Sequence, residues 1–285
     1  MKHYIAIDIG GTNIKYGSVS QNGDVLSRSE ISTPASTDGQ ALLSCLEEIV
    51  KELIDDETEG IGIATLGAVD SQKGCVIGMC ENLPAIKDLP IAGYLKDRFK
   101  LPVSLANDVN TTALGEAGFG AGKGLDTFFC ITLGTGIGGA YFCEGKVITG
   151  VHGTAGEVGY IWSGKGECYE SLASAKRFSD ESKLLGSVEG KEMEPALKGD
   201  KTYADLLERW SRDVACGIAD VIYLLDPGTI IVGGAISGLG TLLTDKISSK
   251  LEEVLIPDYK GKTKVIPAKN GNASNMLGAI YPFIK

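Results

Sequence analysis

An Asn-Asp pair that follows a short apolar run offers the most distinctive chemistry in the chain. The run, Leu101 to Ala106, predicts a buried strand, and a helix is predicted from about Thr111 to Ala117. Asn107 and Asp108 stand between the two. A carboxylate at the end of a buried strand, beside an amide, can act as a general base. Both residue types are also common helix caps, and these residues alone favour the cap.

A glycine loop near the N-terminus is suited to bind phosphate. Tyr4 to Ile9 predicts a strand that runs into Gly10, Gly11 and Thr12 before a second strand returns. Glycines in a tight turn leave backbone N–H groups pointing at phosphate oxygens, and Thr12 adds a hydroxyl. Asp8, at the end of the strand, is suited to bind Mg²⁺ through water. Gly-Gly is also common in ordinary hairpins, and only the accompanying Asp8 and Thr12 favour the phosphate site.

A second glycine loop has the spacing GxGxxG through Gly134, Gly136 and Gly139. A dinucleotide-binding fingerprint must open a helix. The residues that follow here, Ala140 to Cys143, predict a strand, so we reject the dinucleotide-binding interpretation. We predict instead a second phosphate hairpin. The sequence has no GxxxxGK[ST] motif, which argues against a P-loop nucleotide-binding protein.

A third glycine pair, Gly233-Gly234, follows the apolar run Thr229 to Val232 and precedes a helix predicted near residues 239 to 255. A strand that enters a helix through two glycines lets a flat ring lie against the backbone, so an adenine base can rest here. A plain strand-to-helix turn is an equally good interpretation of these residues alone.

The elements that must position these residues follow one pattern twice. A strand, a glycine loop and a returning strand over residues 4 to 19 recur over residues 128 to 143, which indicates a structural repeat. A hairpin turn at Gln21 to Asp24 predicts a third strand from Val25 to Ile31. Residues 180 to 200 are polar, and no element is predicted for them. Strands mixed with helices throughout predict an α/β protein.

The composition limits the class of partner. The chain has 285 residues and a formal net charge of -10, and its basic residues form no single cluster in the sequence. Nucleic acid and anionic membranes are therefore not expected partners. Seven cysteines without a CxxC pair indicate reduced thiols and a cytoplasmic location. We expect no signal peptide and no membrane-spanning segment.

The three glycine loops and the Asn-Asp pair together resemble, in order and spacing, the sugar-kinase and actin-like ATPase superfamily. More closely, the chain is similar to the ROK family of bacterial sugar kinases and sugar-responsive repressors. The resemblance covers nearly the whole chain. It depends on five motifs, which are Asp8 to Thr12, Asn107-Asp108, Leu133 to Gly136, Gly233-Gly234 and Asn275 to Ala279.

The resemblance implies a two-lobed actin-like (ribonuclease H-like) ATPase fold, with mixed sheets flanked by helices and a cleft between the lobes. The smaller lobe would comprise residues 1–110 plus 270–285, and the larger lobe residues 111–269. ATP would bind across the cleft, with Mg²⁺ at Asp8. The residues implied in binding the nucleotide are Asp8, Gly10, Gly11, Thr12, Lys15, Gly134, Thr135, Gly136, Gly233 and Gly234. The family also suggests a homodimer.

The resemblance further implies a sugar site. The residues implied in holding the sugar are Asn82, Asn107, Asp108, Glu157, Tyr160 and Glu170. Asp108 would accept the proton of a primary hydroxyl, the 6-OH, as that hydroxyl attacks the γ-phosphate of ATP. Sugar hydroxyls need fixed hydrogen-bond partners, because a buried hydroxyl without one is costly. Without the resemblance, solvent exposure in a glycine-rich loop is the preferred interpretation of the two glutamates.

The sequence departs from the family pattern at three places. Tyr160 stands where the family usually has a histidine that contacts both the sugar and a structural zinc. The family's CxCGxxGCxE cluster is reduced to residues 164 to 170, which contain only Cys168, so no zinc site is predicted. Ile86 replaces an aromatic residue. Because these changes would reshape the sugar pocket, a modified hexose is favoured as the substrate. Either N-acetylmannosamine or a β-glucoside would fit, and glucose is the third candidate.

Two other functions are weighed against the kinase. A sugar-sensing repressor would need a DNA-binding segment ahead of the first glycine loop, and only seven residues precede Asp8. A catalytically silent sugar-binding protein related to the ROK repressors is the second alternative. The presence of Asp8, Thr12, Asp108 and Thr135 argues against it.

Overall fold

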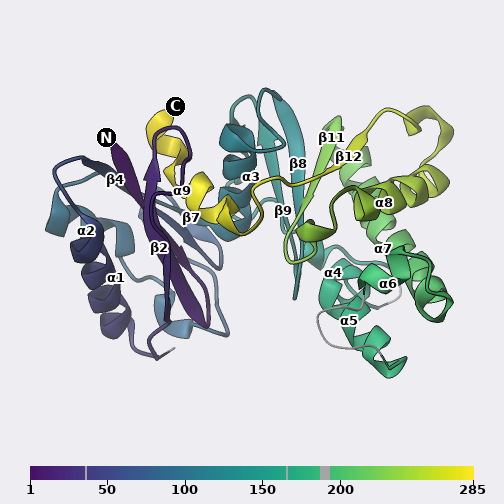
Figure 1. The fold of residues 1–285 in the computed structure, drawn as a ribbon, viewed down its shortest axis with the longest axis horizontal. Helices are drawn as coiled ribbons and strands as arrows, with labels where there is room; N and C mark the ends of the chain where they lie inside the picture. The colour runs from purple at the N-terminus through teal and green to yellow at the C-terminus, as the bar shows by residue number, and fades with distance from the viewer. Residues whose placement is uncertain (36, 165, 187–192) are drawn as a thin grey trace. The chain divides into compact units, whose positions relative to one another are not determined.

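The chain folds into two units, each built on its own five-stranded sheet (Figure 1). In this computed structural model, the residues described are 1–35, 37–164, 166–186 and 193–285. Unit 1 comprises Met1–Lys123, Thr149–Ala155 and Asn272–Lys285, and unit 2 comprises Gly124–Ile148 and Gly156–Gly271. The chain therefore leaves unit 1 twice and returns to it at the C-terminus. There the ring of Phe283 stacks on that of Tyr4, with ring centroids 5.4 Å apart.

The sheet of unit 1 has the strand order β3-β2-β1-β4-β7. Its strands are β1 (His3–Ile9), β2 (Asn13–Ser20), β3 (Ser29–Ser32), β4 (Thr58–Thr65) and β7 (Val103–Asn107). The short strands β5 (Val69–Asp70) and β6 (Cys75–Val76) pair separately. Strand β1 runs antiparallel to β2 and parallel to β4, and β4 runs parallel to β7. The sheet is therefore mixed.

Helices cover both faces of this sheet, because successive residues of a strand point to opposite faces. Ile5, Ile7 and Ile9 of β1 share a buried cluster with α1 (Gly39–Leu53) and α2 (Ile91–Phe99). Tyr4 and Ala6 share another with the C-terminal helix α9 (Ser274–Ile284). Figure 1 shows α1 and α2 on one side of the sheet and α9 on the other. Helix α3 (Asp108–Phe119) and the 3₁₀ turn η1 (Pro84–Ile86) complete unit 1, with the 3₁₀ turn η5 (Gly271–Ala273) leading into α9.

The third strand is shorter than predicted from the sequence. The prediction of a strand from Val25 is wrong, because β3 begins at Ser29 and Val25 makes only an isolated bridge. The N–H groups of Leu26 and Ser27 both donate to the carbonyl of Ser18, at 2.8 and 3.3 Å. Two residues that face one in this way form a bulge, which interrupts regular pairing.

The sheet of unit 2 has the order β10-β9-β8-β11-β12. Its strands are β8 (Thr127–Leu133), β9 (Ile137–Cys143), β10 (Lys146–Val147), β11 (Thr229–Gly233) and β12 (Lys264–Pro267). Its helices are α4 (Tyr169–Ala173), α5 (Ala175–Leu184), α6 (Met193–Leu197), α7 (Lys201–Leu225) and α8 (Gly240–Val254). Three 3₁₀ turns, η2 (Val158–Tyr160), η3 (Ser237–Leu239) and η4 (Pro257–Tyr259), lie between these elements.

The predicted structural repeat is confirmed. In both sheets two antiparallel pairings come first, and two parallel strands follow on the other side of the opening strand. The α/β class is confirmed with it. No element was predicted for the stretch 180 to 200, which contains the end of α5, the whole of α6 and Asp200, the N-cap of α7. Residues 187–192 of this stretch lie outside the described residues.

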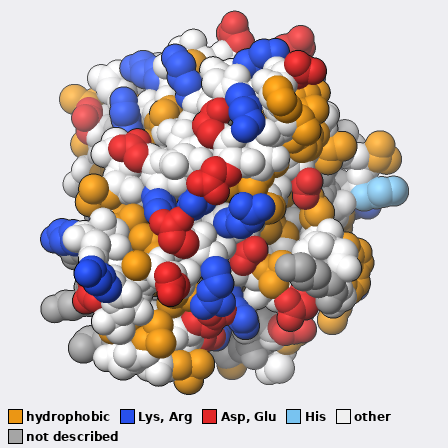
Figure 2. Space-filling model, turned by 90° about the vertical axis from the view of Figure 1, so that its right-hand side faces the viewer, with side chains coloured by type: hydrophobic (Ala, Val, Ile, Leu, Met, Phe, Trp, Pro, Cys, Tyr) orange, Lys and Arg blue, Asp and Glu red, His pale blue; other side chains and the backbone are white. Residues whose placement is uncertain are grey.

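Charged side chains of both signs alternate on the face of the molecule that Figure 2 shows. In unit 2, helices α7 and α8 are joined by ion pairs from Lys250 to Glu208, at 2.6 Å, and from Arg212 to Glu253, at 3.8 Å. A surface that binds nucleic acid gathers one sign of charge, whereas the described part of this face mixes the two. Among the described residues, no helix is long and apolar enough to cross a bilayer.

Candidate functional site

Three parallel strands of unit 1 end at the same edge of its sheet, and predicted site residues lie there. Asp8 of β1 pairs in register with Ala64 of β4, and Ala64 pairs with Ala106 of β7. Asp8 and the Asn107-Asp108 pair are thus brought to the carboxyl ends of β1 and β7, the two strands that flank β4. Ligands of open α/β sheets bind outside that edge.

Helix α3 begins at Asp108, before its predicted start, because Asn107 caps it. The Asn107 Oδ1 accepts hydrogen bonds from the N–H groups of Val109, at 2.9 Å, and Asn110, at 3.2 Å. Its Nδ2 donates to the carbonyl of Gly67 at 3.1 Å. Asp108 is the first residue of the helix, where Oδ1 accepts from the N–H of Val109 at 2.9 Å and the helix dipole favours an ionised carboxylate. The main capping role therefore belongs to Asn107.

Asp8 is a half-buried carboxylate held by an amide. The Nδ2 of Asn275 donates to its Oδ1 at 3.2 Å. Burial raises the pKa of Asp8, while the bond from Asn275 and the positive charges of Lys15 and Arg28 lower it in part. A carboxylate that is costly to ionise is a suitable ligand for a hard cation, whose charge compensates for the lost water. The chemistry at this position therefore fits Mg²⁺.

The first glycine loop joins β1 to β2 and leaves no room for larger residues. The N–H of Gly10 donates to the carbonyl of Asn13 at 3.0 Å, and the hydroxyl of Thr33 donates to the carbonyl of Gly10 at 2.8 Å. A Cβ on Gly10 would lie 2.8 Å from the Asn13 oxygen, and one on Gly11 would lie 2.8 Å from the Cβ of Asn82. The loop thus places Asn82, a predicted sugar ligand, directly beside the predicted phosphate site.

The second glycine loop, in unit 2, joins β8 to β9. The strand at residues 137–143 confirms that this GxGxxG sequence does not open a helix. The N–H of Gly134 donates to the carbonyl of Gly136 at 2.9 Å, and the N–H of Lys176 donates to the carbonyl of Gly134 at 3.1 Å. The Glu170 carboxylate accepts from the N–H of Ile137 at 2.8 Å, and a Cβ on Gly136 would overlap that carboxylate. Thr135, between the two glycines, is exposed.

The two predicted sugar-binding glutamates lie in unit 2, and the charge of Glu170 acts on Glu157. Burial of its carboxyl group and the charge of Glu170 both raise the pKa of Glu157. Tyr160 ends the 3₁₀ turn that begins after Glu157, and the residue is 70% exposed. Ile86 differs, because it is fully buried in the core of unit 1. It therefore cannot reach a sugar directly, and any effect on the pocket must pass through its neighbours.

The third glycine pair ends β11 and turns back against the second loop. Gly234 has a φ of +89°, and a Cβ there would meet the backbone of Leu133. Only glycine combines this conformation with so close an approach. The backbone at Gly234 and Ala235 is exposed, and the turn at Ser237–Leu239 separates it from α8. An exposed backbone beside the glycine loop suits a flat ring.

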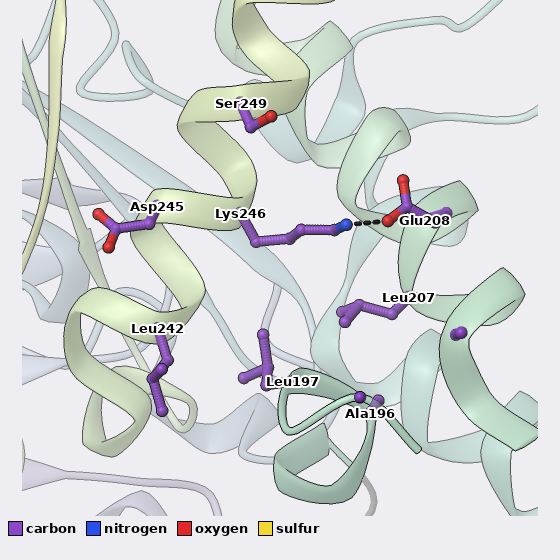
Figure 3. A pocket seen from close by; sticks show the side chains of 10 residues that line it. Ala196, Leu197, Leu207, Glu208, Leu242, Asp245, Lys246 and Ser249 are labelled. Atoms are coloured by element: carbon purple, nitrogen blue, oxygen red, sulfur yellow. Dashed lines mark hydrogen bonds and ion pairs between the residues drawn. The ribbon is translucent and has the colours of Figure 1, made fainter. Parts of the chain in front are cut away.

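Unit 2 also contains a pocket of about 390 Å³ between α6, α7 and α8, which the sequence did not predict (Figure 3). Leu197, Leu207 and Leu242 give it apolar walls. Lys246 extends across it to form an ion pair with Glu208. Burial and the neighbouring Lys250 lower the pKa of Lys246. Lys246 and Glu208 compensate each other within this pocket, and we assign no ligand to it.

One residue of the site in unit 1 was missed, although its segment was recognised. Asn275 belongs to a motif that carried the family resemblance, yet no role was assigned to it. The only available signal was an amide at the start of a helix, a position where asparagine usually acts as a cap. Its contact with Asp8 joins residues 267 positions apart, which no local pattern reveals.

The described residues contain no group of three His, Cys, Asp or Glu side chains arranged to hold a metal ion. Cys168, the one cysteine in the segment compared with the zinc cluster, lies 3.7 Å from the hydroxyl of Ser171. Lys165, in the same segment, lies outside the described residues. A Mg²⁺ ion needs fewer protein ligands, because it keeps several waters and binds substrate phosphates.

Comparison with known proteins identifies the family. The model of the ROK family matches residues 4–285. A glucokinase of Thermotoga maritima is 30% identical over 96% of this chain and 95% of its own length. A β-glucoside kinase of Listeria monocytogenes is 28% identical over 98% and 97%.

A solved structure extends the similarity to the fold. A ROK family glucokinase from Streptomyces griseus, in complex with glucose and AMPPNP, is 31% identical and superimposes with a TM-score of 0.81, over 97% of both chains. The actin-like ATPase fold implied by the sequence is thereby confirmed. The motifs, the duplicated sheet and these matches agree, and the chain belongs to the ROK family.

Proposed function

We propose that this protein is an ATP-dependent kinase that transfers the γ-phosphate of ATP to the 6-OH of a hexose or hexose derivative. The observation that carries the proposal is the edge of the unit 1 sheet, where Asp8 lies next to the last residue of β1 and Asp108 directly follows β7. The glycine loop with Asn82 beside it lies at the end of the same strand as Asp8. Phosphate, metal and hydroxyl ligands all have suitable partners there.

In this proposal Asp108 accepts the proton of the attacking hydroxyl. Its position at the start of α3 favours a negative charge on the carboxylate, and Asn107 fixes the turn that carries it. The amides of the Gly10–Thr12 and Gly134–Gly136 loops orient the phosphates, with Lys15 close to Asp8. When bound at Asp8, Mg²⁺ neutralises charge on the phosphates. Gly233 and Gly234 offer their backbone to the adenine base.

The sugar is proposed to bind Asn82, Asn107, Glu157, Glu170 and Tyr160 through its hydroxyl groups. Ionised glutamates accept hydrogen bonds from hydroxyls, and such charge-assisted bonds are the stronger ones. The exposed ring of Tyr160 offers a flat surface to a substituent on the sugar. We therefore propose N-acetylmannosamine or a β-glucoside ahead of glucose.

A coupled assay of ADP release from Mg-ATP, run against a panel of sugars, tests this function. The panel comprises glucose, mannose, N-acetylglucosamine, N-acetylmannosamine, cellobiose and an aryl β-glucoside. We expect one of them to raise ADP release far above the rate without sugar, and phosphorus NMR of the product to show a 6-phosphate. Folded protein that binds a sugar, seen as a thermal shift, but releases no ADP with any of them would support the silent sugar-binding alternative.

A further inference from the structure

The C-terminal helix α9 packs very closely against α3, the helix that Asp108 begins. Gly115 of α3 and Gly278 of α9 lie at this contact, and a Cβ on Gly278 would overlap the carbonyl oxygen of Thr111. A Cβ on Gly115 would likewise overlap the carbonyl oxygen of Ser274. The two helices can approach so closely only because both residues are glycine.

This approach creates a chain of hydrogen bonds from α3 through Asn275 to Asp8. The hydroxyl of Thr112 donates to the Oδ1 of Asn275 at 2.7 Å, and the Nδ2 of Asn275 donates to the Oδ1 of Asp8 at 3.2 Å. The hydroxyl of Thr111 lies 3.4 Å from the same Asn275 oxygen but only 2.8 Å from the carbonyl of Asp108. Because a hydroxyl has one proton, Thr111 donates to Asp108 and Thr112 fixes Asn275.

The direction of these bonds decides which side of the Asn275 amide faces Asp8. With its oxygen held by the Thr112 donor, the amide can present only its NH₂ group to the carboxylate. A rotated amide would point an oxygen at the Asp8 carboxylate, and the two acceptors would repel each other. Thr112 therefore sets the orientation of Asn275, and Asn275 sets the position of the Asp8 carboxylate.

We propose that Asn275 is a positioning residue for the phosphoryl transfer proposed above: it holds the Asp8 carboxylate at a fixed place relative to the start of α3, and so to Asp108. The inference rests on the proposed function, because Asp8 is assigned to Mg²⁺ only there. The metal side and the base side of the reaction are joined through the last helix of the chain. In this proposal Asn275 acts through Asp8.

The neighbouring Ser274 provides a matched control. Its hydroxyl donates to the buried Glu116 of α3 at 3.3 Å, so it also joins α9 to α3, and this bond leads to Glu116 instead of Asp8. A purely structural role for Asn275, in docking α9, would make Asn275→Ala and Ser274→Ala behave alike. A positioning role would make them differ in every measurement that depends on Mg²⁺.

The experiment compares Asn275→Ala, Thr112→Val, their double variant and Ser274→Ala with the unmodified protein. Calorimetric titration with ADP, in the absence of sugar and at several Mg²⁺ concentrations, gives the Mg²⁺ dependence of nucleotide binding without any turnover. We expect Asn275→Ala to need roughly 10-fold more Mg²⁺ for half-maximal effect, the scale of one lost bond to a charged group. Thr112→Val should shift it in the same direction by about 3-fold, and the double variant should equal Asn275→Ala, because the two act in series.

Activity separates this inference from the proposed function. In turnover assays kcat should fall in Asn275→Ala while the KM for the sugar stays unchanged. The inference is overturned if Asn275→Ala and Ser274→Ala show the same Mg²⁺ dependence, or if the effects of Thr112→Val and Asn275→Ala add. It is also overturned if ADP binding by the unmodified protein does not depend on Mg²⁺.

If Asn275→Ala fails to fold, the comparison of Thr112→Val with Ser274→Ala tests the inference by itself. Mg²⁺-dependent ADP binding without phosphorylation of any sugar would instead count against the kinase, while these variants still test Asn275.

Discussion

The Glu170 carboxylate accepts a 2.8 Å hydrogen bond from the backbone N–H of Ile137, the first residue after the second glycine loop. The same carboxylate occupies the space that a side chain on Gly136 would need. A residue assigned to the sugar from the family pattern is therefore also part of the support of the proposed phosphate loop. The two substrates would share one side chain in unit 2.

We expect Glu170→Ala to weaken nucleotide binding even without sugar. The change leaves the Ile137 N–H without its charged acceptor, a loss of about 2 kcal/mol or roughly 30-fold in affinity. Glu170→Gln keeps an oxygen that can accept this bond, so its affinity for ADP should fall less than 5-fold, by our rough estimate. Titration with ADP in the absence of sugar measures both.

Glu157→Ala serves as the control, because Glu157 is assigned to the same sugar, whereas the N–H of Ile137 donates to Glu170. Its ADP affinity should match that of the unmodified protein. Equal ADP affinities for Glu170→Ala and Glu157→Ala would show that the hydrogen bond from Ile137 to Glu170 does not contribute to nucleotide binding.

The sequence predicted what local patterns encode and missed what only packing creates. The two glycine loops and the duplicated sheets follow from strand periodicity and turn residues, whereas α3 begins at Asp108 and not near Thr111 as predicted. The bulge at Leu26 and Ser27 depends on a single carbonyl in another strand, at Ser18. The contact of Asn275 with Asp8 depends on two glycines that let distant helices meet, and the burial of Ile86 depends on the core around it.

Asp108→Asn should lower kcat by about 10²–10⁴, which is the usual contribution of a general base. The amide has the same shape and can still accept from the N–H of Val109, so α3 should begin at the same place. Sugar affinity, measured by thermal shift or calorimetry, should change little. Near-normal turnover by Asp108→Asn would contradict the assignment of the base.

Asn107→Ala tests the other residue of the pair, because it removes the cap of α3 and should destabilise the fold by about 1 kcal/mol.

Sugar affinity should rise with pH through the pKa of Glu157. Burial and the charge of Glu170 raise that pKa above its ordinary value of 4.5. At lower pH the carboxyl group is protonated, and a sugar hydroxyl that donates to the ionised form must displace that proton. Binding therefore strengthens as pH rises from about 4.5 through the raised pKa and levels off above it.

Calorimetric titrations with the preferred sugar at several pH values measure this dependence. Glu157→Gln should bind the sugar more weakly at neutral pH, and its sugar affinity should no longer fall as the pH is lowered. If the loss of sugar affinity at low pH persists unchanged in Glu157→Gln, another group is responsible for that pH dependence.

Gly278→Ala should destabilise the protein by about 3 kcal/mol, because its Cβ would overlap the Thr111 carbonyl and force α9 away from α3. Gly93→Ala is the matched control. Gly93 is exposed on α2, and a Cβ there meets nothing within 4 Å. Replacing a helical glycine at such a site should stabilise the protein by roughly 0.5–1 kcal/mol. Thermal and urea unfolding of both variants measure the difference in stability.

The same pair of variants tests the Mg²⁺ dependence of ADP binding, because the contact at Gly278 also sets the distance from Asn275 to α3. Gly278→Ala should need more Mg²⁺ for half-maximal ADP binding, and Gly93→Ala should need as much as the unmodified protein. Equal stabilities for the two variants would mean that α9 can shift without cost and that its close contact with α3 does not hold Asp8 in place.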